Sequence, residues 1–358
     1  MRNKYDVLII GGGVFGAAIF YYLSKNTSLT VCLLEQKKFC SGATRHSGGF
    51  IRMLHPSKKL SELAARSFKE YVNFKQNIGT SCGFVETGFT TLMKKSDFTL
   101  IKDNIKILRN LNIKIEIFDT ASVVFNGTHF YIADDEVLLY EPNSGYADPF
   151  KVTMAYIEKG IELGGIAIEH HRVKNLIIDG DKVVGVQTDN KLFEYIQSNC
   201  VVVSAGVNTD KILSKNNIKK SNTSSNFFLR KQICLNIYSY PDKHTILPTF
   251  MDKVSGLYAR NCGNGRCILG LTENLSLVEF QYKLYNIAKH VIPDFHKYTL
   301  YKTANTFESY TNDNLGISEF SDQIQGVFIC SGWSGCGFKI APECGKQAAA
   351  KISNFFNI

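Results

Sequence analysis

The first 35 residues alternate between short apolar runs and one helical pattern. Tyr5 to Ile10 and Thr30 to Glu35 are short, β-branched apolar runs of the kind that forms buried parallel strands. Between them, three glycines precede a pattern of helical periodicity from Phe15 to Lys25, which ends at Asn26 to Ser28. This order predicts a strand, a helix and a second, parallel strand within about 30 residues.

Apolar spacing predicts further elements along the rest of the chain. The expected helices cover residues 57–80, 97–110, 148–163, 275–290 and 341–355. The expected strands cover residues 88–94, 114–119, 166–173, 176–188, 199–206, 230–239, 248–260, 266–272 and 326–332. Within residues 176–188, Asp179–Gly180 is a turn signal that splits the segment into a hairpin.

Segments of the nucleotide-binding type therefore occur at the start, in the middle and at the end of the chain. We predict an α/β protein with a discontinuous, Rossmann-like dinucleotide-binding domain that comprises residues 1–55, 145–215 and 300–358. The insertions, residues 56–144 and 216–299, are predicted to form an α+β substrate domain with a mixed or antiparallel sheet.

A glycine motif marks the expected cofactor site. Gly11, Gly13 and Gly16 form GxGxxG directly after the first strand and open the first helix. The first glycine permits a tight turn, the second lets the backbone approach a pyrophosphate, and the third lets helix and strand pack closely. Glu35 ends the second strand, where a ribose hydroxyl needs an acceptor, and its charge disfavours a 2′-phosphate. The motif therefore indicates FAD or NAD rather than NADP.

Composition narrows the class of protein. With 44% hydrophobic and 20% charged residues, the chain fits a soluble globular enzyme. The net charge of +9 favours anionic ligands, but the densest basic stretch, residues 215–220, is polar and lacks any nucleic-acid motif, so no nucleic-acid partner is expected. No apolar stretch is long enough to predict a transmembrane helix, while peripheral membrane contact stays open. The ten cysteines show no zinc spacing, which favours a reducing, cytoplasmic setting and no metal site.

Five segments, taken in order, resemble one enzyme family. They are the glycine motif, the GFIR segment that ends at Arg52, and residues 145–156 (GYADPFKVTMAY), 265–272 (GRCILGLT) and 332–342 (GWSGCGFKIAP). Together they resemble the D-amino-acid-oxidase-like superfamily of FAD enzymes, which includes glycine oxidase and monomeric sarcosine oxidase. The resemblance covers nearly the whole chain and implies that the cofactor is FAD.

The resemblance also implies which residues bind FAD. Gly335 to Phe338 would bring backbone donors to the pyrimidine edge of the flavin, where a helix N-terminus stabilises the reduced ring. The backbone of Val173 would meet the adenine. The full expected set is Gly11, Gly13, Val14, Phe15, Gly16, Glu35, Gln36, Ala43, Thr44, Arg45, His46, Ser47, Gly48, Val173, Ala205, Gly206, Gly332, Gly335, Cys336, Gly337, Phe338 and Lys339. For His46 a purely structural role stays an alternative.

On the substrate side, sarcosine-oxidase-like members hold the substrate carboxylate with an arginine and a lysine. These positions fall on Arg52 and Lys339. A guanidinium binds a carboxylate through two parallel hydrogen bonds, and an ammonium adds a point charge. Tyr258 matches an aromatic position that borders the substrate. The alternatives are a solvated or structural Arg52, a Lys339 that pairs only with protein groups, and a Tyr258 that belongs to the core.

Three positions depart from the family pattern. Glu308 or Ser309 stands where sarcosine-oxidase-like enzymes have the cysteine that binds FAD covalently, which predicts non-covalent FAD. Ile268 replaces a lysine that assists oxygen activation, so the electron acceptor, oxygen or another, stays open. Cys336 replaces a histidine of the family's SGHG segment, so the substrate does not carry over from relatives.

The favoured hypothesis is an FAD-dependent oxidoreductase that oxidises a small amino acid or N-alkyl amino acid. A hydride would pass from the oriented Cα–H to flavin N5, and the resulting imine would hydrolyse. No strong base for the amine is evident in the sequence. One alternative is a flavin dehydrogenase of a 2-hydroxy acid or polyol phosphate that passes electrons to a quinone or a protein. Another is a non-catalytic FAD-binding subunit of a larger complex. The substrate's identity and stereochemistry and the oligomeric state, a homo-oligomer included, stay open.

Overall fold

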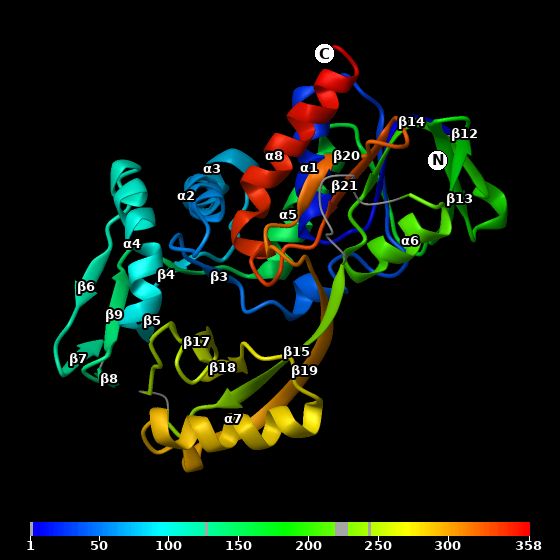
Figure 1. Ribbon diagram of the computed structural model, residues 1–358. Coiled ribbons are helices and arrows are strands. Elements are labelled where there is room, and N and C mark those ends of the chain that lie inside the picture. Colours follow the sequence, from blue (N-terminus) through cyan, green and yellow to red (C-terminus); the bar gives the residue numbers. More distant parts are fainter. Residues whose placement is uncertain (1–2, 126–127, 219–227, 243–244) are drawn as a thin grey trace.

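Two eight-stranded sheets and the helices packed on them make up most of the structure (Figure 1). The computed structural model describes residues 3–125, 128–218, 228–242 and 245–358; residues 219 and 220 of the basic stretch lie outside these ranges. In the described part of the chain, no helix is both long and apolar enough to cross a membrane. The same residues contain no group of three His, Cys, Asp or Glu side chains arranged to hold a metal ion.

The first sheet has the predicted strand–helix–strand unit at its centre. β1 (Lys4–Ile10) pairs in parallel with β2 (Val31–Leu34) on one side and with β14 (Tyr195–Val203) on the other, and α1 (Val14–Asn26) connects β1 to β2. Because β14 comes from the middle of the chain, the centre of the sheet already joins distant segments. The predicted α/β fold with a discontinuous Rossmann-like part is confirmed.

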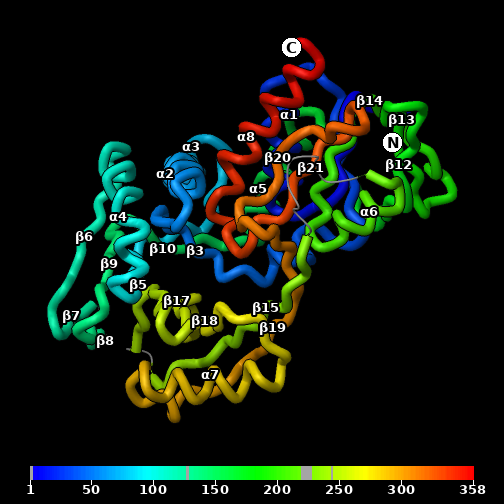
Figure 2. Tube along the Cα trace, in the orientation of Figure 1, coloured from blue at the N-terminus to red at the C-terminus, as the bar shows by residue number. Residues whose placement is uncertain are grey.

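Further strands extend this sheet at both edges. β11 (Ile166–Ile168) pairs in parallel with β2, and β21 (Val327–Ser331) pairs in parallel with the second half of β14. The first half of β14 instead pairs with the predicted hairpin of β12 (Val173–Asp179) and β13 (Lys182–Thr188), and β20 (Ile317–Phe320) lies antiparallel beside β21. Figure 2 shows by colour that the start, middle and end of the chain meet here.

Both faces of the first sheet are covered. Val7 and Ile9 of β1 pack into an apolar cluster with α1, α2 (Lys58–Val72), α5 (Pro149–Glu162) and α8 (Gly337–Phe355). Leu8 and Ile10 point to the opposite face, toward the β12–β13 hairpin and α6 (Thr209–Lys215). A parallel strand that is buried on both faces needs apolar residues at every position, which explains the unbroken apolar run in β1.

The second sheet is mixed, as predicted for the substrate domain. All of its neighbours pair antiparallel except β16 and β5, which are parallel. α7 (Leu277–Val291), which starts at a capping box of Ser276 and Glu279, packs on one part of it, and α4 (Lys95–Asn110) packs on another. The strand order is β19 (Thr299–Tyr310), β15 (Leu229–Ser239), β18 (Arg266–Leu271), β17 (Leu257–Gly263), β16 (Phe250–Asp252), β5 (Phe89–Lys94), β9 (Glu136–Glu141) and β6 (Glu116–Phe118).

Smaller elements complete the described chain. They are the three-stranded sheet of β3 (Phe50–Ile51), β10 (Gly145–Tyr146) and β4 (Val85–Glu86), the pair β7 (Ser122–Phe125) and β8 (Thr128–Tyr131), α3 (Phe74–Ile78), and the 3₁₀ turns η1 (Ala43–His46), η2 (Lys191–Phe193), η3 (Gly206–Asn208) and η4 (Phe295–Lys297).

Four predicted elements differ from the structure. The helix over 57–80 is two helices, because α2 ends at Val72 and Asn73 separates it from α3. The strand over 248–260 is interrupted by a turn in which the Asp252 carboxylate accepts hydrogen bonds from the N–H groups of Val254 and Ser255. The strand over 166–173 ends at Ile168, and His170 has a left-handed φ of 58°.

The last helix shows the fourth difference, since α8 starts before the predicted residue 341 and runs through Pro342. A proline has no N–H for the carbonyl four residues earlier, here that of Phe338. The Tyr71 hydroxyl donates to this carbonyl at 2.5 Å, so a side chain from α2 replaces the missing backbone bond.

Strand β19 was not expected from the sequence. It pairs along β15 over most of its length, so residues 299–310 belong to the second sheet rather than to the predicted nucleotide-binding segment 300–358. The first sheet resumes only with β20.

Candidate active site

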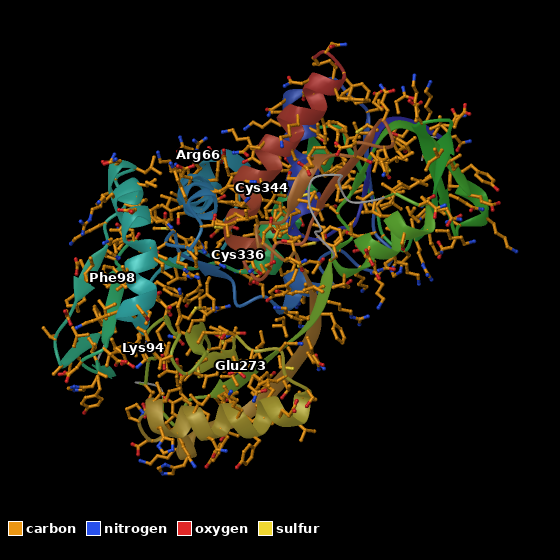
Figure 3. All side chains as sticks on the ribbon, in the orientation of Figure 1. Arg66, Lys94, Phe98, Glu273, Cys336 and Cys344 are labelled. Atoms are coloured by element: carbon orange, nitrogen blue, oxygen red, sulfur yellow. The ribbon has the colours of Figure 1, made fainter. Side chains whose placement is uncertain are left out.

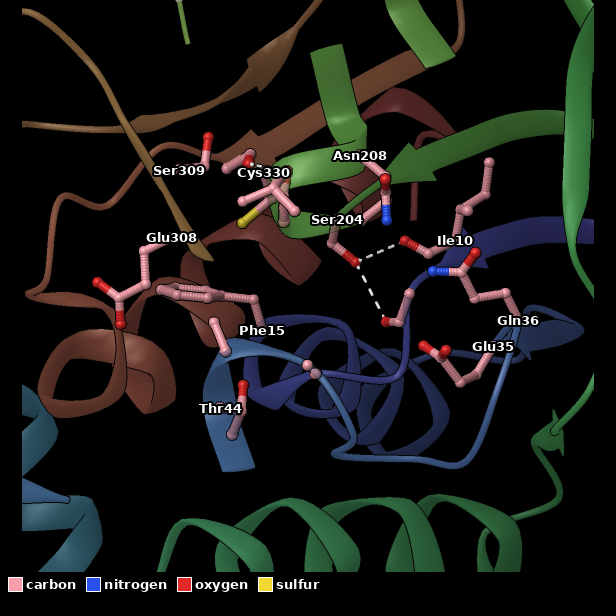
Figure 4. A pocket seen from close by; sticks show the side chains of 18 of the residues that line it. Ile10, Phe15, Glu35, Gln36, Thr44, Ser204, Asn208, Glu308, Ser309 and Cys330 are labelled. Atoms are coloured by element: carbon pink, nitrogen blue, oxygen red, sulfur yellow. Dashed lines mark hydrogen bonds between the residues drawn. The ribbon is translucent and has the colours of Figure 1, made fainter. Parts of the chain in front are cut away.

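A cavity of about 440 Å³ lies at the carboxyl ends of the parallel strands. It is lined by Ile10, Leu34, Ser204 and Ser331, which lie at or just beyond the ends of β1, β2, β14 and β21. Figure 4 shows Ile10 and Ser204 in its wall. This is the position at which open α/β sheets bind nucleotides. The Ser204 hydroxyl donates to the carbonyl of Ile10 at 3.0 Å and thereby fixes the strand ends to each other.

The glycine motif shapes one wall of the cavity. Gly11 has φ +110°, and a Cβ there would lie 2.5 Å from the carbonyl oxygen of Ser204. A Cβ at Gly16 would lie 2.0 Å from the carbonyl oxygen of Gly11, so only glycine lets α1 approach this closely. Gly13 caps α1 without a side-chain hydrogen bond, and the Val14 N–H donates to the Thr44 hydroxyl at 3.2 Å. The first turn of α1 thus offers backbone donors and a positive helix end to an anionic group.

Glu35 lies at the end of the cavity where the nucleotide is expected, here called the nucleotide end. Its two carboxylate oxygens accept hydrogen bonds from the N–H groups of Gly12 at 2.8 Å and Lys37 at 2.9 Å. Gln36 and Val173 line the cavity beside it. These bonds hold the carboxylate in one orientation, with lone pairs left for a ribose hydroxyl.

The opposite end of the cavity is formed by β19 and the turn before α8. Phe15 and Trp333 stack there with ring centroids 5.0 Å apart, and Gly335, Gly337 and Phe338 line the wall. Figure 4 shows Glu308 beside Phe15, across the cavity from Glu35 and Gln36. Because Glu35 marks the nucleotide end, this opposite end is where the redox-active ring of a bound dinucleotide would lie.

Most of the expected cofactor residues line this cavity. Those that do are Gly11, Gly13, Val14, Phe15, Glu35, Gln36, Ala43, Thr44, Ser47, Val173, Ala205, Gly206, Gly332, Gly335, Gly337 and Phe338. Gly16, Arg45, His46, Gly48, Cys336 and Lys339 do not. Gly16 packs against the strand, and the carbonyl of Gly48 accepts a hydrogen bond from Arg260.

Other residues that line the cavity were not predicted from the sequence. They are chiefly the β19 residues Thr306 to Ser309, a rim of exposed cations (Lys37, Arg172, Lys174, Lys211 and Lys215), and Ser204, Asn208, Cys330 and Trp333. The apolar strand ends VVVS and FICS could have indicated Ser204 and Cys330, whereas β19 gave no strand signal.

The structure brings Arg52 and Lys339 together beside the cavity. Both are buried, at 8% exposure. The guanidinium of Arg52 donates to the carbonyl of Leu54, and the Lys339 ammonium donates to the carbonyl of Gly335 at 3.2 Å. Burial lowers the pKa of Lys339, and the nearby Arg52 charge lowers it further. In the described part of the chain neither side chain forms an ion pair with a carboxylate.

Two carboxylates, the buried Glu141 and the half-buried Glu308, lie near these cations without pairing directly. The Glu141 carboxylate accepts hydrogen bonds from the N–H groups of Met53 and Leu54 and from the Ser144 hydroxyl. Burial raises the pKa of Glu141, and the Arg52 charge opposes that rise. Burial likewise raises the pKa of Glu308, and Lys339 opposes it. The positive charges of Arg52 and Lys339 are therefore only partly compensated by carboxylates of the protein.

Tyr258 belongs to an aromatic cluster rather than to the cavity wall. It is 9% exposed and packs edge-on against Phe50 at 5.5 Å between ring centroids, and Phe50 packs in the same way on Phe89. Burial and then the Glu308 charge raise the pKa of its hydroxyl. Tyr258 therefore lies close to the Arg52 and Lys339 group but inside the packed core.

Two further titratable residues at this place had no sequence signal. Burial and the Arg52 charge lower the pKa of Lys253, in the turn between β16 and β17, to about 8. His55 is fully buried, and burial together with Arg52 and Lys339 holds its pKa well below the usual range. Its Nδ1 lies 3.8 Å from the Cys336 sulfur, at the end of α8 that faces the second sheet (Figure 3).

The sequence matches the profile of a known family. A sequence profile of the family described as "FAD dependent oxidoreductase" (DAO) matches residues 6–351. The chain belongs to this family. The DAO family uses FAD, and the residues present fit that cofactor: a glycine turn and a helix end suit the pyrophosphate, and a fixed carboxylate suits the ribose.

Individual relatives are distant. The chain is 23% identical over 96% of its length to the mitochondrial pyruvate dehydrogenase phosphatase regulatory subunit of Mus musculus, and 22% identical over 98% to mitochondrial sarcosine dehydrogenase of the same species. It covers 41% and 40% of these curated proteins, so it spans about two fifths of their length. The crystal structure of L-proline dehydrogenase from P. horikoshii has a TM-score of 0.86 at 22% identity and covers 99% of this chain and 94% of that one, which shows that the fold is shared.

Proposed function

We propose that this DAO-family chain oxidises a small amino acid or N-alkyl amino acid to an imine, with FAD in the cavity described above. The observation that carries the proposal is the pair of buried cations, Arg52 and Lys339, which form no ion pair with any described carboxylate. A buried charge without a counter-ion is costly. An anionic group of the substrate would supply the missing counter-charge and would bind tightly to both cations.

The residues have distinct tasks in this proposal. Arg52 binds the substrate carboxylate through its guanidinium, and Lys339 adds a second positive charge. Tyr258 limits the space next to them. With the carboxylate fixed, the Cα–H is presented in one orientation, which converts a random encounter into an aligned one. Bound FAD supplies the two-electron acceptor.

The names of the relatives support a substrate with an amine and a carboxylate. One is a sarcosine dehydrogenase and another an L-proline dehydrogenase. In both cases the name describes oxidation of an amino acid with a secondary amine. A cation pair suits the carboxylate of such compounds and also that of a primary amino acid.

The cofactor is proposed to be bound without a covalent link. By resemblance, Glu308 or Ser309 stands at the position at which sarcosine-oxidase-like enzymes carry their linking cysteine. Acid precipitation of the holoprotein should therefore leave the flavin in the supernatant. Flavin that stays with the pellet after acid treatment would contradict this part of the proposal.

The proposal is tested by anaerobic titration of the holoprotein with D-, L- and N-methyl amino acids, followed by 2-hydroxy acids. Bleaching of the visible flavin band by an amino acid, with ammonia or methylamine released, is the expected result. Readmitting air then separates oxidase from dehydrogenase, because only an oxidase reoxidises rapidly. Bleaching by 2-hydroxy acids alone would replace the amine substrate with an alcohol.

A second candidate function is a non-catalytic FAD-binding subunit. The similarity to a regulatory subunit over 96% of the chain favours it. This candidate predicts that FAD is retained but that no small molecule in the panel bleaches it. The same titration therefore decides between the two.

The ten cysteines bear on location. All are free thiols, and most are buried. We propose a reducing compartment such as the cytoplasm, where unpaired thiols persist. Fluorescence localisation of the full-length tagged protein tests this, and an oxidising compartment would contradict it.

A further inference from the structure

Glu308 is a carboxylate on the wall of the cofactor cavity. Of the described residues that line the cavity, only Glu35 and Glu308 carry carboxylates. They lie at opposite ends, as Figure 4 shows: Glu35 at the nucleotide end and Glu308 beside Phe15 at the other. The only negative side chain that lines the redox end of the cavity in the described chain is therefore Glu308.

The two carboxylates differ in how they are satisfied. Glu35 accepts two backbone hydrogen bonds and is held in place by them. The Glu308 carboxylate forms no hydrogen bond or ion pair with another described residue; it is half-buried on β19, and a cofactor in the cavity would cover it further. A carboxylate that is buried without donors is destabilised in its charged form. Its protonation therefore depends on what else occupies the cavity.

The charged and titratable neighbours of Glu308 come from several elements. The positive charge of Lys339, at the start of α8, opposes the rise in the pKa of Glu308 that burial causes. The other such groups on the packed elements are Tyr310 and Lys302 of β19, Tyr258 of β17, Lys231 and Cys234 of β15, Arg45 and His46 of η1, and Cys336 before α8. The Lys231 ammonium lies over the Tyr310 ring rather than on the carboxylate.

We propose that Glu308 takes up one proton when the flavin at this end of the cavity is reduced, so that reduction is coupled to protonation of the protein. The inference rests on the proposed placement of FAD. Reduced flavin carries a negative charge, and two like charges in a site of low dielectric constant destabilise each other. Lys339 and the N-terminus of α8 favour that charge, whereas an ionised Glu308 opposes it. Protonation of Glu308 removes the repulsion.

The proton balance is simple. In an equilibrium reduction, two electrons and one proton enter the flavin, and a second proton enters Glu308. During turnover the second proton would come from the substrate ammonium, which must lose it before the carbon is oxidised. Glu308 would thus supply the proton acceptor that the sequence did not reveal.

The experiment is potentiometric and needs no substrate. The flavin midpoint potential of the holoprotein is measured against pH across the neutral range by equilibration with reference dyes. One proton per two electrons changes the reduction equilibrium tenfold per pH unit, about 30 mV, and two protons change it a hundredfold, about 60 mV. Wild-type protein should show the two-proton slope, and Glu308→Gln the one-proton slope with a higher potential at alkaline pH.

Two further variants serve as controls. Glu308→Asp keeps the titrating group and should keep a two-proton region. Glu319→Gln removes an exposed glutamate from β20 and should leave the wild-type slope unchanged. A one-proton slope in the wild-type protein overturns the inference even if Glu308→Gln does not fold, and a two-proton slope that persists in Glu308→Gln assigns the proton elsewhere and overturns it too.

Failure of the inference is distinguishable from failure of the proposed function. FAD that binds as firmly to a Gly16→Val variant as to wild type would place the cofactor outside the cavity. Normal placement with the wrong slope would reject only the role of Glu308.

Discussion

The nucleotide end of the cavity and the group around Arg52 and Lys339 are built on different principles. The nucleotide end consists largely of backbone: glycine turns, the start of α1, and a glutamate held by two N–H groups. The other region consists of buried charged side chains that lack direct counter-ions among the described residues. The backbone groups of the first region are held in place without a ligand, whereas the positive charges of the second would be balanced by the carboxylate of the proposed substrate.

This difference separates features that members of the family share from features that can differ between members. A backbone site tolerates little change, because a single Cβ blocks it. A side-chain site can exchange its charges while the fold stays the same. Cofactor use is therefore common to the family, while in the proposed function the choice of substrate depends on which side chains surround Arg52.

The largest expected effect is at Gly16. Gly16→Val should abolish FAD binding, because even a Cβ would lie 2.0 Å from the Gly11 carbonyl oxygen and push α1 away from the strand. Gel filtration with FAD, followed by absorbance of the protein peak, measures retention. Asn26→Val, at the exposed C-terminal end of the same helix and away from the cavity, is the control. If the valine variant bound FAD as firmly as the wild-type protein, the proposed placement of the cofactor in the cavity beside α1 would be wrong.

The next largest effect is at Arg52. Arg52→Ala should lower kcat/KM for carboxylate substrates by roughly a hundredfold, because the carboxylate loses its bidentate partner. Arg66→Ala, on the exposed face of α2 (Figure 3), removes a similar side chain and should have little effect. A loss of threefold or less in Arg52→Ala for every carboxylate substrate would show that Arg52 does not bind it.

A smaller effect is expected at Glu35. Glu35→Gln should weaken FAD binding by about tenfold, since one charged acceptor of a ribose hydroxyl becomes neutral. Fluorescence quenching of FAD added to the apoprotein gives the dissociation constant. Glu158→Gln removes an exposed glutamate from α5 and serves as the matched control. Equal affinities for the two variants would remove Glu35 from the cofactor site.

The smallest expected effect concerns pH. The pKa of Lys253 is lowered to about 8, so this side chain loses its charge as the pH rises through that value. The affinity for a carboxylate inhibitor should therefore fall by about threefold in this range because one cation near Arg52 is lost. In Lys253→Met the fall should be smaller. Spectral titration of the bound flavin at a series of pH values measures it, and identical profiles for both proteins would exclude Lys253 from the site.

Much of the nucleotide end could be predicted from the sequence. The glycine spacing, the strand before it and Glu35 each have a local pattern, and all of them meet in the cavity. The substrate side could be predicted only through resemblance, which named Arg52 and Lys339 but gave no information on Lys253 or His55. These two residues gain their shifted pKa values from burial by distant segments, and no short motif encodes that.

Elements that depend on distant pairing were also missed. The sequence of β19 is largely polar and half exposed, and the strand is defined by its long ladder with β15. Conversely, the apolar residues of 248–260 predicted one continuous strand, whereas the hydrogen bonds to Asp252 form a turn within it. The helix predicted over 341–355 starts earlier, at Gly337, and runs through Pro342 because the Tyr71 hydroxyl donates to the carbonyl that the proline leaves without a backbone donor.

The discontinuous lining of the cavity has a consequence for how the protein is made. The wall combines residues 10–47, 171–215 and 306–338, and β21 must join β14 to finish the parallel sheet. During synthesis the glycine turn emerges well before residues 306–338, and the cavity is not closed around a flavin until those residues have left the ribosome. FAD should therefore stabilise only chains in which all three lining segments have folded together. A cell short of FAD would accumulate full-length chains that remain open to proteolysis.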